Sequence, residues 1–165
     1  MIKVKTVARM SVMTALAVLL GYVEGLFPPP VAIPGIKLGL ANVIIIMILY
    51  TAGAKQAWMV AVMKVSLCAL LFGSATSFLY SLCGAVISLA VMSLAKRTKL
   101  FSIVGVSSLG GIFHNMGQLI CAYFFIGKGA ILHIPVLCVC GAVCGVLTGI
   151  AARIILKRGR GIFAE

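Results

Sequence analysis

Six long apolar stretches, separated by short polar or proline- and glycine-containing connectors, make up almost the whole of this chain. An α-helix needs about 20 predominantly apolar residues to cross the hydrocarbon core of a bilayer. We therefore predict an all-α integral membrane protein with six transmembrane helices, folded as a single transmembrane domain over residues 1–165. The predicted spans are residues 6–27, 36–51, 57–72, 77–95, 101–126 and 134–156.

The composition supports this class. Of the 165 residues, 63% are hydrophobic and only 10% are charged, which is more apolar surface than a soluble domain of this length could bury. The net charge of +12 would also suit a nucleic-acid-binding protein. The basic residues, however, occur in short clusters between the apolar stretches, a pattern typical of membrane topology. We therefore expect contact with the lipid bilayer and no nucleic-acid partner.

The basic clusters also predict the orientation of the helices. Eleven of the 14 lysines and arginines lie at the N-terminus, at Lys55, in the connector 96–99 or in the C-terminal tail, all on one side of the predicted membrane. Lys37 and Lys128 lie on the opposite side. Because cytoplasmic loops carry an excess of lysine and arginine, both termini are predicted to lie in the cytoplasm.

One stretch carries far more polar side chains than its surroundings: GVSSLGGIFHNMGQ, residues 105–118. At about 100° per residue, Ser107, His114 and Gln118 fall on one face of a helix, with Asn115 beside them. An unpaired polar group is costly in lipid, so this face must contact protein or a cavity. It either joins helices through hydrogen bonds or lines a binding site.

Polar residues of other spans lie towards the same, outer end of the predicted bundle. Lys37 and Asn42 stand at the start of the second span, after a proline-rich connector, residues 28–35, that is expected to be stiff and non-helical. We therefore predict a pocket that opens outward and binds a small molecule. Its predicted lining residues are Lys37, Asn42, Lys64, Ser107, His114, Asn115 and Gln118.

Lys64 lies near the middle of the third span, where a lysine costs about 2.5–3.5 kcal/mol on insertion scales. One interpretation is that its side chain reaches towards the membrane surface or pairs with Glu24, the single carboxylate in the predicted membrane region. The other is that it provides the counter-charge for an anionic ligand. Both stay open.

The sequence offers little for catalysis or metal binding. All six cysteines fall within predicted spans, where they are expected as small apolar residues. Cys138, Cys140 and Cys144 share a span but lack the partner motif of a zinc site. Glu24 is the one carboxylate outside the tail that could orient a catalytic base. We expect no enzymatic activity, no bound metal and no cofactor.

Small residues at four-residue spacing predict close helix packing. Gly141, Gly145 and Gly149 form two overlapping GxxxG motifs in the last span. Ser11 and Ala15 form a comparable pair in the first span, which serves either packing within the chain or contact with a partner. A further packing seam in the fourth span consists of Ser77, Ser81, Gly84 and Ser88.

Two motifs connect the sequence to a known family. The segments IPGIKLGLAN, residues 33–42, and GGIFHNMGQL, residues 110–119, resemble those of the bacterial Gx transporter family, which is also labelled heptaprenyl diphosphate synthase component I. The resemblance covers nearly the whole chain and implies a protein of the bacterial plasma membrane. It also implies a bundle similar to the S components of energy-coupling-factor vitamin transporters, with an outward-facing pocket covered by the first loop.

The resemblance implies partners as well. In S components, small residues on the first helix meet a transmembrane coupling subunit that two ATPases drive. Ser11 and Ala15 resemble that docking pair only approximately, because two alanines are the commoner form. Members of the family are also associated with flavin-linked extracellular electron transfer in Gram-positive bacteria.

The synthase label can be compared with the composition. Prenyl-chain elongation relies on Mg²⁺ held by clustered aspartates, yet the chain contains no aspartate. Our leading hypothesis is a membrane-embedded substrate-binding subunit that captures a small vitamin-, flavin- or isoprenoid-related solute from outside and is energised by separate subunits. The alternative is a non-catalytic accessory subunit of heptaprenyl diphosphate (menaquinone side-chain) synthesis or of a flavin-based extracellular electron-transfer assembly.

Overall fold

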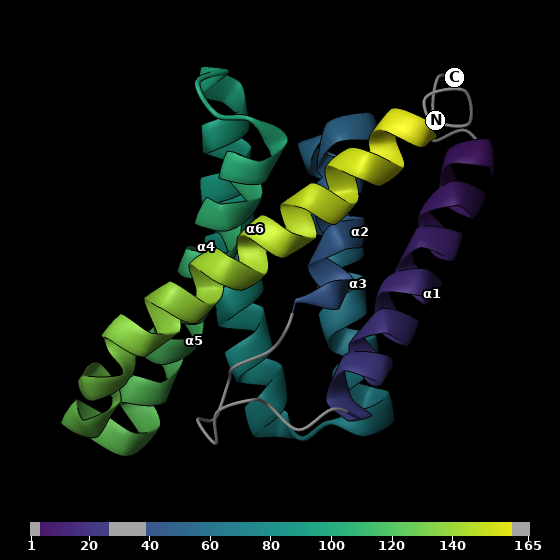
Figure 1. The fold of residues 1–165 in the computed structure, drawn as a ribbon. Coiled ribbons are helices and arrows are strands. Elements are labelled where there is room, and N and C mark those ends of the chain that lie inside the picture. Colours follow the sequence, from purple (N-terminus) through teal and green to yellow (C-terminus); the bar gives the residue numbers. More distant parts are fainter. Residues whose placement is uncertain (1–3, 27–38, 160–165) are drawn as a thin grey trace.

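The computed structural model describes residues 4–26 and 39–159, and the regular structure within these ranges is helical throughout (Figure 1). The prediction of an all-α protein with six helices is confirmed. The elements are α1 (Val4–Leu26), α2 (Leu40–Thr51), α3 (Ala54–Phe72), α4 (Ala75–Thr98), α5 (Ile103–Ile126), the 3-10 helix η1 (Gly127–His133) and α6 (Ile134–Arg158).

The outer surface of the helices is apolar, as contact with lipid requires. Within the described residues, four helical segments are long and apolar enough to cross a membrane: α1, α3, α4 and the continuous run of η1 and α6. Their mean hydropathies lie between 1.4 and 2.4. Large side chains such as Leu70, Phe124 and Leu132 are 81–82% exposed, which suits a surface that faces lipid. The chain is therefore a multi-pass membrane protein.

Local signals start the helices close to the predicted positions. The side chains of Ser74 and Ser102 cap α4 and α5, each accepting a hydrogen bond of 3.2 Å from the backbone N–H three residues further on. The second helix differs most from its prediction, because α2 begins at Leu40 rather than at residue 36. Gly39 precedes it with a φ of 76°, in the left-handed region that glycine adopts without strain. Residues 27 and 36–38 of the predicted spans lie outside the described residues.

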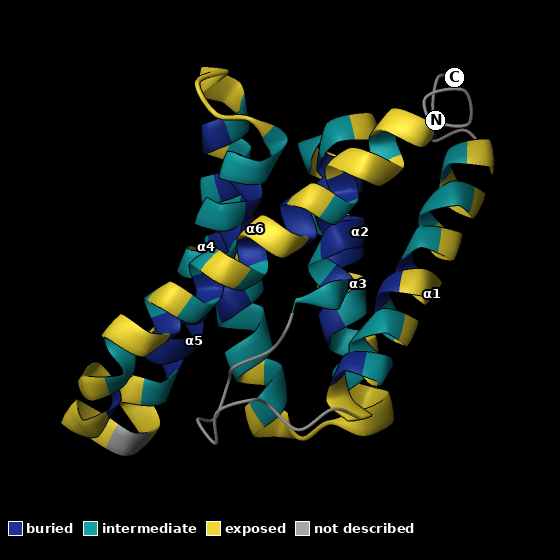
Figure 2. Ribbon diagram, viewed as in Figure 1, coloured by how far each residue is buried: buried dark blue, intermediate teal, exposed yellow. Residues whose placement is uncertain are grey.

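Helix α2 forms the core of the bundle. It packs against α1, α3 and α6, and so connects one half of the molecule, α1 to α3, with the other half, in which α5 lies between α4 and α6 (Figure 1). Its 12 residues span about 18 Å. Every residue from Val43 to Leu49 is buried (Figure 2), as expected for a helix that protein encloses on all sides.

Glycines bring α5 into backbone contact with both of its neighbours. A Cβ atom added to Gly145 of α6 would lie 2.6 Å from the carbonyl oxygen of Ser107 in α5. One added to Gly117 of α5 would lie 2.6 Å from the carbonyl oxygen of Cys83 in α4. No larger side chain fits at these distances without separating the helices. The close packing predicted for the GxxxG motifs of the last span is thereby confirmed.

Lys96 joins the end of α4 to the end of α2. Its Nζ donates a hydrogen bond of 2.5 Å to the carbonyl oxygen of Leu49 and lies 5.0 Å from the centre of the Tyr50 ring. The last carbonyl groups of a helix lack partners within the helix and attract cations, and the aromatic face adds a cation–π contact. A lysine that the sequence presents only as part of a basic connector therefore also connects two helices.

We predict that Lys96→Met lowers the free energy of unfolding by about 1.5–3 kcal/mol, the range for hydrogen bonds to charged groups. Arg97→Met is the matched control, because this substitution removes the same charge from the same helical turn. Arg97 itself is exposed. The cost of this substitution should stay within about 0.5 kcal/mol. Unfolding in mixed micelles, followed by circular dichroism, measures both. Equal losses in the two variants would show that the Lys96 contacts do not stabilise the fold.

Candidate functional site

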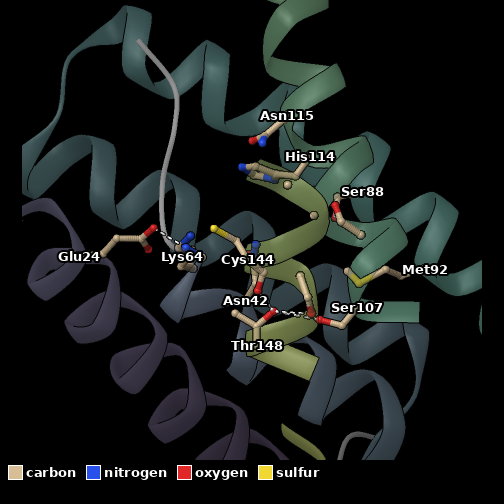
Figure 3. A pocket seen from close by; sticks show the side chains of 15 residues that line it. Glu24, Asn42, Lys64, Ser88, Met92, Ser107, His114, Asn115, Cys144 and Thr148 are labelled. Atoms are coloured by element: carbon tan, nitrogen blue, oxygen red, sulfur yellow. Dashed lines mark hydrogen bonds between the residues drawn. The ribbon is translucent and has the colours of Figure 1, made fainter. Parts of the chain in front are cut away.

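A polar cavity, here named the central cavity, lies where all six α-helices meet (Figure 3). Its volume is about 30 Å³, which is room for about two water molecules. Every helix contributes at least one polar side chain to it. From α1 to α6 these include Glu24, Asn42, Lys64, Ser88, His114 and Thr148.

Five of the seven residues that the sequence predicts for a pocket lie around the central cavity. Asn42 comes from α2 and Lys64 from α3, whereas Ser107, His114 and Asn115 come from α5. The periodicity of one helix places the last three together, and the fold adds the first two. Residues up to 73 positions apart in the chain thus share one small polar space.

Two of these residues also join α5 to α6. The hydroxyl oxygens of Ser107 and Thr148 are 3.0 Å apart and share a hydrogen bond, and Nδ2 of Asn115 donates one of 2.8 Å to the carbonyl oxygen of Leu137. Both residues of α5 are buried. The polar stripe therefore holds helices together and also lines the cavity, to which His114 contributes from the same helix.

The remaining two predicted pocket residues lie elsewhere. Gln118 is 4% exposed, its Cγ lies beside Gly84 of α4, and it is not among the described residues that line the central cavity. Within the described part of the chain, its Oε1 atom has no hydrogen-bond partner. Lys37 lies outside the described residues.

The predicted docking pair, Ser11 and Ala15, is exposed on α1. Ser11 borders a groove of about 190 Å³ between α1 and α3, together with three methionines, Met10, Met59 and Met63. This face of α1 is open to lipid or to another protein, and contact with a partner stays a prediction.

Glu24 connects the end of α1 to the start of α2. The residue is buried, and its Oε1 accepts a hydrogen bond of 2.5 Å from the backbone N–H of Gly39. Gly39 directly precedes α2, and the unpaired N–H groups at a helix start favour a carboxylate. The sequence suggested Glu24 as a partner for Lys64 and as the one carboxylate that could orient a base, but nothing in its spacing indicated a contact with the backbone before α2.

Lys64 reaches from α3 towards α1. A Cβ atom added to Gly21 would lie 3.6 Å from Cε of Lys64, and Gly21 lies one helical turn before Glu24. Glu24 and Lys64 extend into the same part of the central cavity (Figure 3). Both roles predicted for Lys64, pairing with Glu24 and contact with a ligand, are compatible with this position.

Helix α6 supplies cavity residues that sequence reasoning missed. Cys144 and Thr148 line the central cavity beside Gly141 and Gly145. The four residues lie at relative positions 0, 3, 4 and 7, which is one face of a helix. The GxxxG motif therefore marked this face of α6. Thr148 could have been found as a polar residue one helical turn after the motif, on the same face.

A second and larger cavity, here named the outer cavity, lies between α1, α3 and α4 at the helix ends predicted to face outward. Its volume is about 380 Å³, and its side chains include Tyr22, Cys68, Phe72, Ser77 and Ser81. Gly21 and Gly25 of α1 and Gly73, which directly follows α3, line it as well, which leaves backbone rather than side chains at those positions. This cavity was not predicted from the sequence.

The residues of the predicted packing seam of α4 lie in two different surroundings, the outer cavity and the contact with α5. Ser77 and Ser81 line the outer cavity together with residues of α1 and α3, and the packing role predicted for them stays a prediction. Gly84 lies against His114 of α5, and Ser88 donates a hydrogen bond of 2.8 Å to the carbonyl oxygen of Gly110. The packing prediction is confirmed for these two residues.

Lipid-facing helices around a cavity lined by polar side chains of every α-helix define a helical membrane protein with an interior site. The chain belongs to the family described as heptaprenyl diphosphate synthase component I, whose model matches residues 13–155. This is one of the two labels that the sequence motifs indicated, and it denotes one component of a synthase that has at least one partner subunit. The family and the helices together place the protein in the bacterial plasma membrane.

Neither the curated proteins nor the solved structures contain a match to the chain. The likeness to S components of energy-coupling-factor transporters therefore stays a prediction from the two sequence motifs.

We predict that Glu24→Met lowers the free energy of unfolding by about 1.5–3 kcal/mol, because the N–H of Gly39 loses a charged acceptor. Glu24→Gln keeps an acceptor oxygen at the same place and should lose less than half as much. Unfolding in mixed micelles compares the two variants with the parent protein. A Glu24→Met protein as stable as the parent would mean that the contact between α1 and α2 contributes nothing.

Proposed function

We propose that the protein is a membrane-embedded binding subunit that captures a small solute from the outer side and acts together with separate partner subunits. The observation that carries this proposal is the convergence of polar side chains from all six helices on the central cavity. Polar and ionisable groups inside a membrane are costly, and they commonly mark the path or the site of a solute. Packing alone would not require a contribution from every helix.

The chemistry of the central cavity suits a polar group of a solute. Asn42 offers an amide, His114 an imidazole and Lys64 an ammonium group, so hydrogen-bond donors and acceptors are both present. Glu24 balances the charge of Lys64 within the same cavity. A carbonyl, hydroxyl or amide group of a solute would replace the water that fits there.

The size of the cavity indicates how binding would proceed. Pockets for small organic ligands usually measure about 300–1,000 Å³, whereas the central cavity measures about 30 Å³. We infer that the cavity is contracted in this structure and that binding of a solute separates the helices. Movement of α1 would suffice, because α1 packs against α2 and α3 and has few buried residues.

The energy for transport would come from another subunit. The chain contains no GxxxxGK[ST] phosphate-binding loop, so ATP would be bound elsewhere. A transmembrane coupling subunit with ATPases remains the partner that the motifs imply, and the exposed pair Ser11 and Ala15 is the docking surface we propose for it.

The family description favours a second candidate function, that of a non-catalytic membrane subunit in heptaprenyl diphosphate synthesis. The absence of aspartate from the whole chain would place the Mg²⁺-dependent chemistry on a soluble partner. In that case the polar side chains around the central cavity would stabilise the fold through their hydrogen bonds. The partner would dock at the cytoplasmic ends of the helices.

The test compares two histidine variants. We predict that His114→Ala reduces the amount of small molecule that co-purifies with the protein in nanodiscs at least about tenfold, which corresponds to about 1.4 kcal/mol of binding free energy. His133→Ala is the matched control, because His133 lies in η1 and hydrogen-bonds to Gly129 there. Untargeted mass spectrometry of the extracted molecules gives the readout.

The same preparations separate the two candidate functions. Loss of one molecule in His114→Ala, with an unchanged melting temperature, supports solute capture. If no molecule distinguishes the two variants and a soluble prenyl diphosphate synthase subunit co-purifies with both, the capture function is wrong and the accessory function is supported.

A further inference from the structure

The outer cavity is large enough for an organic molecule, and the central cavity is not. Its volume of about 380 Å³ lies within the usual range of ligand pockets, about 300–1,000 Å³. It adjoins the polar site, because Gly21 and Cys68 line the outer cavity beside the side chain of Lys64. A Cβ atom added to Gly21 would lie 3.2 Å from Sγ of Cys68 and 3.6 Å from Cε of Lys64.

Lys64 therefore stands between the two spaces. It lines the central cavity, and its stem passes the glycine that lines the outer one. The four-carbon stem of a lysine is flexible, and Gly21 presents no side chain to block its movement. A change of the Lys64 rotamer would join the small central cavity to the large outer cavity, whose described lining residues carry no charge.

We propose that the outer cavity binds the ring portion of an uncharged, ring-bearing solute whose polar end reaches Lys64 and the central cavity. This inference rests on the proposed function, because it names the class of solute that the same site takes. The solute is amphipathic, with an apolar ring system and a carbonyl or hydroxyl group at one end.

The charges around the two cavities favour a solute without net charge. None of the described residues that line the outer cavity is charged, and Ser77, Ser81 and Tyr22 offer hydroxyl groups. In the central cavity Glu24 and Lys64 have opposite charges that offset each other. An ionised solute would bring an unmatched charge into a site surrounded by lipid, which is costly.

Two aromatic side chains favour a ring over a flexible chain. The rings of Tyr22 and Phe72 have centroids 4.7 Å apart and are tilted by 43°. They remain 43% and 52% exposed although both line the cavity, so ring surface is left for a further contact. Aromatic faces and edges pack well against other rings, and Gly25, where an added Cβ atom meets no described atom within 4 Å, leaves open space in the cavity lining.

Cys68 provides a direct probe of this cavity. A full-length variant with Cys68 as its single cysteine is reconstituted in nanodiscs, and its alkylation by N-ethylmaleimide is timed with and without 2-naphthol. We expect saturable protection of Cys68, with at least about a fivefold slower reaction. A variant with Cys140 as the single cysteine is the control, because α6 does not contribute to the described lining of the outer cavity, and its rate should not change.

Two further probes test the chemical class. 2-Naphthoate has the same ring with a negative charge, and 1-decanol has a hydroxyl group on a flexible chain. Each should protect Cys68 less than about twofold. Equal protection by 2-naphthoate would overturn the requirement for an uncharged solute, and equal protection by 1-decanol would overturn the preference for a ring. Protection by 2-naphthol that does not saturate would show partition into the bilayer and overturn binding.

Two glycine variants locate the binding in the outer cavity. A Cβ atom added to Gly25 meets no described atom within 4 Å, so Gly25→Leu places a larger side chain in the cavity lining without a clash at its Cβ atom. A Cβ atom on Gly129 in η1 likewise meets nothing, which makes Gly129→Leu the matched control. Protection by 2-naphthol should disappear in Gly25→Leu and persist in Gly129→Leu, and persistence in both would contradict the proposal.

The co-purifying molecule separates failure of this inference from failure of the proposed function. If His114→Ala loses that molecule and Gly25→Leu retains it, solute capture stands and the outer cavity is not part of the site. If both lose it, the two cavities form one site, as we propose. If neither loses it, both the capture function and this inference are wrong.

Discussion

The cost of an unpaired polar group in hydrocarbon is the constraint on which the rest of this structure depends. Helix α5 carries a polar stripe that cannot face lipid, so other helices must enclose it. Glycines on α4, α5 and α6 allow that enclosure, because they bring backbones to distances at which no side chain fits. The hydrogen bonds between Ser107 and Thr148 and from Asn115 to the carbonyl oxygen of Leu137 then satisfy part of the stripe. Of the rest of the stripe, His114 lines the central cavity, whereas Gln118 is buried beside Gly84 of α4.

The same constraint explains the half of the molecule that α1, α2 and α3 form. Helix α2 is short and buried on all sides, it packs against α6, and its Asn42 lines the central cavity. Glu24 and Lys64 approach from α1 and α3 and are enclosed there together. Ionisable groups of opposite sign in one small cavity offset each other, whereas either alone would be costly in this environment. The arrangement therefore makes a polar interior compatible with a lipid-facing exterior, and it supplies the groups with which a solute would interact.

Much of the fold could be predicted from the pattern of apolar residues, because span length and the connectors limit where helices begin and end. The face shared by Ser107 and His114 followed from helical periodicity alone. The contact between Glu24 and Gly39 could not be predicted, because it depends on how the chain returns after the proline-rich connector. Ser77 and Ser81 show a second limit: small residues at regular spacing indicate a surface that permits close approach, but only the neighbouring helices decide whether packing or a cavity results.

The central claim is that this polar interior binds a solute, and a density map of the protein tests it most directly. The protein is purified from its host membrane into nanodiscs, and its size of 17.3 kDa requires a bound antibody fragment for cryo-electron microscopy. The account predicts non-protein density that contacts His114 and Asn42 and extends past Lys64, with the helices further apart than in the contracted state. A map in which side chains and one or two waters fill the central cavity in every particle class would contradict it.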